Sequence, residues 1–269
     1  MYPENKQKLL LLGKVILAVI TFCGLHLLCW FIPLDAVSTQ LSFVVDGGLN
    51  VLIGFVFLVL FVKLIDKEKL ISSDWFSPKN RIKEFFIGGL FGSICILLGF
   101  LIIININWSQ VATGYLRLDF LLGCLFSFLC GAFLEELFFR GYVLRKLLEK
   151  FSSVISLTLS SLIFCLLHCL NDNVTFLSIT NIFLAGLLLG ILFIKTKNIW
   201  LATGFHFLWN YVHAILGFNV SGGEYPSILH LNFESTNLFN GGDFGFEGSY
   251  VCTIIILLAL CFYYKKLNR

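Results

Sequence analysis

Eight runs of about twenty apolar residues dominate this 269-residue chain. A helix of that length crosses the hydrocarbon core of a bilayer, and only helices or closed barrels can satisfy their backbone polar groups there. The composition agrees, because 58% of the residues are apolar and only 13% are charged, far from the averages of soluble proteins. We therefore predict an all-α polytopic membrane protein, a bundle of about eight transmembrane helices. The expected spans are 9–33, 47–65, 84–106, 118–144, 151–170, 175–195, 198–218 and 249–264.

Lysine and arginine residues cluster at alternate ends of these spans. Basic residues in short loops are retained on the cytoplasmic side of a membrane, so both termini are expected to be cytoplasmic and the longest connection, 219–248, to be an outer loop. We expect the first span to be retained, because it is longer than the apolar region of a signal peptide. The net charge of +3 follows from this topology and predicts no nucleic-acid partner. A single membrane domain over 1–269, in a bacterial cell membrane, is the expected organisation.

Three charged residues lie within six positions deep in the span 118–144, namely Glu135, Glu136 and Arg140. A charged side chain at the bilayer centre costs about 2.5 to 3.5 kcal/mol on insertion scales, so such residues face one another or a functional site. Glu136 and Arg140 are four residues apart and fall on one helical face, where they can form an ion pair. That pair is compatible with a structural role and equally with a direct catalytic one.

Two further pairs show the same four-residue spacing: Phe164 with His168, and His206 with Asn210. His168 and Glu135 lie about equally far from the turn that joins their spans, so they are expected at the same height. A simple depth count places His168 nearer the outer surface than His206, so helix tilt, or a fourth helix that protrudes beyond Arg140, has to bring them together. A lone His or Asn in a membrane is more often a helix-to-helix hydrogen bond. The hypothesis of one polar chamber therefore rests on their convergence.

These residue types suit hydrolysis in a chamber shielded from lipid. With Glu136 neutralised by Arg140, Glu135 is the natural general base for a water molecule held with His168. Donors from His206 and Asn210 would then meet the oxyanion that forms on an attacked carbonyl. A second interpretation stays open, in which two His and one carboxylate bind zinc that generates the nucleophile. The metal set would be Glu135, His168 and His206, although the chain has no HExxH helix.

The motif residues resemble those of the CAAX protease and bacteriocin-processing family, which includes the type II CAAX prenyl endopeptidases. Three ordered motifs carry the resemblance, which extends over about 118–260: two glutamates then three residues and Arg (135–140), Phe then three residues and His (164–168), and His then three residues and Asn (206–210).

The resemblance implies an intramembrane endopeptidase and assigns a role to each motif residue. It implies that Glu135 and His168 activate water and that His206 and Asn210 stabilise the oxyanion. The remaining motif residues, Glu136 and Arg140, would support the site. Members of the family are described both as metalloproteases and as metal-independent glutamate enzymes, so zinc stays an open cofactor.

The substrate expected from these features is a hydrophobic, membrane-anchored peptide, a lipidated tail or a leader-bearing peptide, with membrane lipids as the surrounding partners. The sequence leaves the oligomeric state open. A rival hypothesis is a non-catalytic immunity or interaction protein that keeps the same fold. A transporter with a proton relay is a third, but its polar residues would extend along several helices to both faces, whereas here they cluster at one level.

Overall fold

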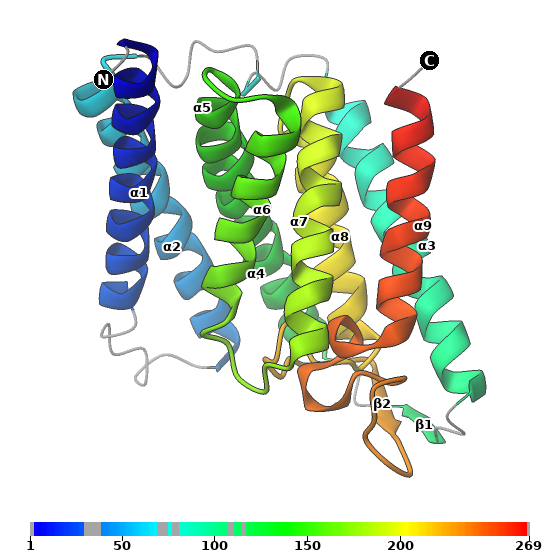
Figure 1. Cartoon of the computed structure of the whole chain (residues 1–269). Helices are drawn as coiled ribbons and strands as arrows, with labels where there is room; N and C mark the ends of the chain where they lie inside the picture. The colour runs from blue at the N-terminus through cyan, green and yellow to red at the C-terminus, as the bar shows by residue number, and fades with distance from the viewer. Residues whose placement is uncertain are drawn as a thin grey trace.

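The computed structural model describes residues 3–29, 39–68, 75–76, 81–106, 110–113 and 117–267. Each apolar run is a helical rod (Figure 1). The rods are α1 (Pro3–Cys29), α2 (Thr39–Phe61) with η1 (Val62–Asp66), α3 (Ile82–Ile106), α4 (Leu118–Glu136) with η2 (Leu137–Leu144) and α5 (Arg145–Leu148), α6 (Ser153–His168), α7 (Phe176–Thr196), α8 (Trp200–Ile215) and α9 (Tyr250–Leu267). Residues 30–33, the end of the first predicted span, lie outside the described residues.

The helical content confirms the predicted class of an all-α polytopic membrane protein. Within the described residues, five rods are long and apolar enough to cross a membrane, and α6 and α9 contain shorter apolar helices. The start of α1 and the end of α9 lie at the same end of the bundle, together with α5 (Figure 1). This placement agrees with the prediction that both termini share one side, and the assignment of that side to the cytoplasm stays a prediction.

Two short strands depart from a purely helical fold. Strand β1 (Gln110–Thr113) pairs antiparallel with β2 (Leu229–Asn232), at the end of the bundle opposite α5 (Figure 1). The connection between α8 and α9, predicted only as an outer loop, contains β2 and two 3-10 turns, η3 (Gly242–Phe244) and η4 (Phe246–Gly248). This connection therefore has an ordered structure of its own. We call residues 216–249 the outer connection.

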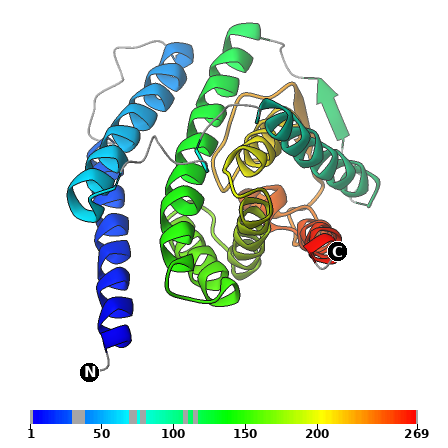
Figure 2. The same ribbon diagram turned by 90° about the horizontal axis from the view of Figure 1, so that it is seen from above.

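Seen from above, α4 lies in the middle of the bundle (Figure 2). Helices α1 and α2 lie on one side of it, and α3, α8 and α9 lie on the other. The phenyl rings of Phe22 on α1 and Phe138 on η2 stack with centroids 3.9 Å apart. Packing of this kind places the polar residues of α4 between two apolar groups of helices.

Helices α3 and α8 approach each other through glycines. A Cβ at Gly88 would overlap the Leu201 carbonyl oxygen, and a Cβ at Gly204 would overlap the Phe85 carbonyl oxygen. Small residues allow this close backbone approach between membrane helices. The contact fixes α8, and with it His206, against α3.

Adding one methyl group at this contact is expected to destabilise the bundle. Gly204→Ala should lower stability by about 1 to 3 kcal/mol, because the new Cβ meets backbone that cannot rotate away. Gly13→Ala is the matched control, since a Cβ there has no atom within 4 Å and alanine favours a helix. Thermal unfolding of both variants in the same detergent checks this expectation. Equal melting temperatures would show that α3 and α8 do not pack as described.

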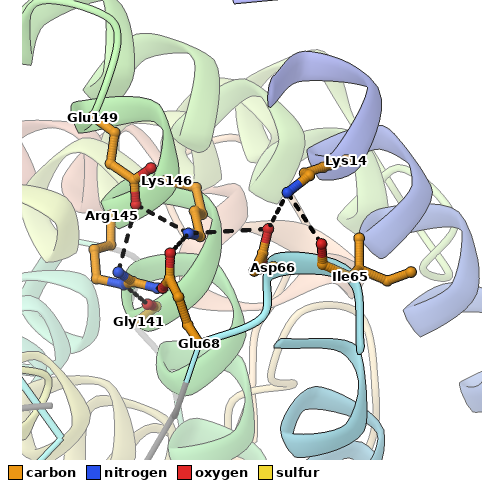
Figure 3. A network of polar contacts seen from close by, with 8 residues as sticks. All are labelled: Lys14, Ile65, Asp66, Glu68, Gly141, Arg145, Lys146 and Glu149. Atoms are coloured by element: carbon orange, nitrogen blue, oxygen red, sulfur yellow. Dashed lines mark hydrogen bonds and ion pairs between the residues drawn. The ribbon is translucent and has the colours of Figure 1, made fainter. Parts of the chain in front are cut away.

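Helix α1 is joined to the rest of the bundle by polar contacts at the end that holds the termini (Figure 3). Lys14 Nζ donates to Asp66 Oδ1 at 2.9 Å, and Lys146 Nζ on α5 donates to Glu68 Oε1 at 2.6 Å. Burial opposes ionisation of Glu68, but the hydrogen bond and the charge of Lys146 lower the pKa of that carboxyl below its usual value. These contacts connect α1, the end of η1 and α5.

Candidate active site

The segment that follows the two adjacent glutamates is a π-helix. All eight residues of η2, 137–144, are buried. The sequence predicted a regular α-helix here, but the hydrogen-bonding pattern widens directly after Glu136. Ser160 Oγ on α6 donates to the Phe139 carbonyl oxygen at 3.2 Å. Short π-helical segments occur frequently at functional sites, and this one carries Arg140.

The predicted pair of Glu136 and Arg140 is present and fully buried, with side chains 0% and 1% exposed. Arg140 Nη1 donates to Glu136 Oε1 at 2.8 Å, and Nη2 donates to the Gly186 carbonyl oxygen on α7 at 3.3 Å. The guanidinium carbon lies 4.5 Å from the centre of the Phe164 ring on α6, within the range of a cation–π contact. Arg140 thus connects three helical rods while it compensates the charge of Glu136.

Both glutamates face the ring of His206. His206 Nδ1 lies 3.0 Å from Glu136 Oε1, and its Nε2 lies 3.9 Å from Glu135 Oε2. Because Glu136 is held by Arg140, it accepts a hydrogen bond from Nδ1 and fixes the orientation of the imidazole ring. The sequence did not predict this contact between Glu136 and His206.

His168 lies at the C-terminal end of α6 and is oriented by its own motif. Its Nδ1 is 2.8 Å from the Phe164 carbonyl oxygen. Since a carbonyl oxygen only accepts, Nδ1 carries the hydrogen and Nε2 remains available as an acceptor in the neutral ring. The Phe164 ring lies 4.5 Å from the His168 ring and 6.2 Å from the His206 ring, measured between centroids. Phe164 therefore contributes both a carbonyl group and an aromatic wall between the two histidines.

A cavity of about 490 Å³ brings the predicted site residues together. Its lining includes Glu135 from α4, His168 from α6, and His206 and Asn210 from α8. The difference in depth between the two histidines therefore does not keep them apart. Glu136 and Arg140 are absent from this lining, among the described residues, and lie behind it. We call this cavity the chamber.

The chamber also contains an acid that sequence reasoning missed as a site residue. Glu247 is 8% exposed and lines the chamber. Its Oε1 accepts from Trp209 Nε1 at 3.0 Å, and its Oε2 accepts from Ser221 Oγ at 2.6 Å and from the Ser221 backbone N–H at 3.1 Å. A glycine-rich run before α9 was the available signal, but no spacing rule relates position 247 to position 209.

The fit of a zinc ion depends on how closely the donors are grouped. The Nδ1 atoms of His168 and His206 each have a hydrogen-bond partner, as zinc-binding histidines usually do. However, within the described ranges no three His, Cys, Asp or Glu side chains are grouped so that they could hold a metal ion. In this arrangement the donor set does not fit zinc without side-chain movement.

Comparison with protein families supports the resemblance found in the motifs. Residues 117–212 match the family model described as Type II CAAX prenyl endopeptidase Rce1-like, and this range includes all three motifs. The matched region is similar to the Rce1-like family and covers less than half of the chain. Comparison with curated proteins and with solved structures gave no match. Helices α1, α2, α3 and α9 and the whole outer connection lie outside the matched region. The extension of the resemblance to about residue 260 stays a prediction.

Proposed function

We propose that this protein is an intramembrane endopeptidase that hydrolyses a peptide bond of a membrane-embedded, lipidated or leader-bearing substrate. One observation carries the proposal. Glu135 Oε2 is buried, has no hydrogen-bond partner among the described residues, and lies in the chamber that His168, His206 and Asn210 also line. A carboxylate with an unused acceptor, beside polar donors in a cavity, is suited to take a proton.

Glu135 would act as the general base. The 3.9 Å between Glu135 Oε2 and His206 Nε2 is too long for a direct hydrogen bond and suits two groups that contact one shared water. Glu135 removes a proton from that water, and the hydroxide attacks the peptide carbonyl carbon. The proton then passes from Glu135 to the leaving nitrogen, so that the products are a carboxyl group and an amine. Nε2 of His168 offers the water a second acceptor.

His206 and Asn210 would stabilise the oxyanion. The Asn210 amide is a donor in every protonation state, whereas His206 Nε2 donates only in the protonated ring, because Nδ1 already carries the hydrogen given to Glu136. The proposed donor role of His206 therefore requires its imidazolium form. Glu136 accepts from Nδ1 of that cation, and the Glu135 carboxylate, 3.9 Å from Nε2, adds a second nearby negative charge that stabilises it and leaves the Nε2–H group for the oxyanion. Preorganised donors of this kind typically contribute about 10²- to 10³-fold to the rate.

Hydrolysis by the wild-type protein is the expected result that tests the proposed function. The protein in lipid nanodiscs is incubated with a set of membrane-anchored peptides in water enriched in ¹⁸O. Mass spectrometry should detect a new C-terminal carboxyl group that contains one ¹⁸O atom, because the nucleophile is water. Peptides that bind but stay intact would support the non-catalytic interaction protein instead.

The same assay with a chelator addresses the zinc alternative. Glutamate-activated water predicts that cleavage continues after EDTA treatment. Loss of cleavage that zinc alone restores would support the metal enzyme, with Glu135, His168 and His206 as its donors.

A further inference from the structure

Glu247 is a buried acid whose partners are all neutral. The three donors that the described residues supply are one indole N–H, one hydroxyl and one backbone N–H. A carboxylate has about four acceptor sites, so Oε1 retains one of them after accepting from Trp209. Because Glu247 lines the chamber, its negative charge acts on whatever the chamber holds.

The lining of the chamber includes another acid, Asp172, on a different connection. Asp172 lines the chamber from the connection between α6 and α7 and is exposed. The adjacent Asn171 donates to the Ser221 carbonyl oxygen at 3.0 Å, and Ser221 donates to Glu247. Ser221 therefore links Glu247 to the segment that carries Asp172.

The imidazolium of His206 that the proposed mechanism requires balances only one of the three acids that line the chamber. The described residues that line it include Glu135, Asp172 and Glu247 but no lysine or arginine. Arg140 lies outside this lining, where it compensates Glu136. In a cavity with low-dielectric walls, uncompensated charges of one sign focus the field and select ligands of the opposite sign.

We propose that the chamber recognises a cationic group of its peptide substrate, a lysine or arginine side chain or a free amino group close to the bond that is cut. The inference rests on the proposed function and names the substrate class for the same chamber. A free C-terminal carboxylate near the cut bond is disfavoured, because it would approach Asp172 and Glu247 with the same charge. Recognition of an internal or N-terminal basic segment, as in a leader-bearing peptide, agrees with this charge distribution.

The test compares membrane-anchored peptides that differ only in whether Lys, Gln or Glu stands at each position around the cut bond. At low salt, kcat/KM of the wild type should be at least tenfold higher for the best Lys peptide than for its Glu counterpart. Asp172→Asn should reduce this preference about two- to fivefold, as expected for an exposed charge pair, mainly through KM. Equal cleavage of the Lys and Glu peptides by the wild type would overturn the proposal.

Two further variants separate charge recognition in the chamber from the effect of the general surface charge. Glu247→Gln should reduce the preference more than Asp172→Asn does, because a buried charge is less screened. Asp243→Asn is the matched control, since Asp243 is an exposed acid of the outer connection that does not line the chamber. It should leave the preference unchanged. A similar loss of preference in Asp243→Asn and Asp172→Asn would show that only the general surface charge matters.

If the wild type cleaves none of the peptides, the inference is tested by measuring how tightly the same peptides bind to the Glu135→Gln variant. Fluorescence anisotropy should show tighter binding of the Lys peptide than of the Glu peptide, through Asp172 and Glu247 alone. Failure of cleavage with this order of binding rejects the proposed function and retains the charge recognition, whereas equal binding rejects the recognition itself. The binding is measured with and without EDTA. A metal cation bound to the acids would make the Glu peptide bind more tightly than the Lys peptide, and EDTA would remove this preference; that result would also overturn the proposal.

Discussion

Glu135→Gln is expected to reduce the rate of peptide hydrolysis by about 10²- to 10⁴-fold, the usual contribution of a general base. The glutamine side chain has nearly the same size but cannot take a proton from water. The fold should be unaffected, because Glu135 Oε2 has no hydrogen-bond partner among the described residues and its side chain is 33% exposed. The measurement is the single-turnover rate constant of cleavage, with the peptide that the wild type cleaves best.

The controls for this variant address folding and charge. The free energy of unfolding of Glu135→Gln should match that of the wild type within about 0.5 kcal/mol, the usual range of substitutions away from core packing and buried networks. Glu224→Gln removes a charge from an exposed site outside the chamber lining and should retain full activity. If Glu135→Gln also kept the wild-type rate, the general base would have to be another group and the proposed mechanism would be wrong.

The sequence predicted the helical rods and the convergence of polar residues because both follow from the large free-energy cost of placing polar or charged groups in lipid. An apolar run of about twenty residues has only one compact solution in a bilayer, so the positions of the spans followed from length and composition. Charges inside an apolar span, as at positions 135, 136 and 140, are expensive in lipid, so they had to face a protein interior or a cavity. The four-residue spacing then placed Glu136 on the same face as Arg140, as the structure shows.

Other features of the site depend on contacts that have no local signature. The widening of the helix in η2 brings Arg140 to the Gly186 carbonyl oxygen and the Phe164 ring, and no residue in 137–144 marks a π-helix in advance. The contact between Glu136 and His206 depends on how α8 packs against α4. Glu247 reaches the chamber only because the outer connection folds back over it. Each of these is set by tertiary packing, which spacing along one helix does not encode.

The buried carboxylate of Glu136 accepts hydrogen bonds from both Arg140 and His206, so changes to the pair of Glu136 and Arg140 affect both stability and activity. Its Oε1 accepts from Arg140 at 2.8 Å and lies 3.0 Å from His206 Nδ1. Its Oε2 is buried and has no hydrogen-bond partner among the described residues. Arg140 is therefore the main source of charge compensation for this carboxylate, and stability and activity depend on the pair in different ways.

Arg140→Met is expected to destabilise the protein by about 3 to 5 kcal/mol, the typical cost of leaving a buried charge without its partner. Methionine fills much of the arginine volume, so the loss would come from the isolated charge of Glu136 and not from a cavity. The measurement is the free energy of unfolding in mixed micelles, with the yield of folded protein as a second readout. Arg81→Met is the matched control, because Arg81 pairs with Glu84 at a part-exposed site where an ion pair contributes about 1 kcal/mol or less.

The double variant Arg140→Met with Glu136→Leu separates the structural from the catalytic role of the pair. Replacing both members of a buried ion pair by apolar residues is often neutral or stabilising, so most of the lost stability should return. Activity should not return, because His206 Nδ1 loses the acceptor that orients the ring and balances its protonated form. A double variant that regains the wild-type rate would show that the pair is purely structural. One as unstable as Arg140→Met would show that the charge of Glu136 is not what Arg140 compensates.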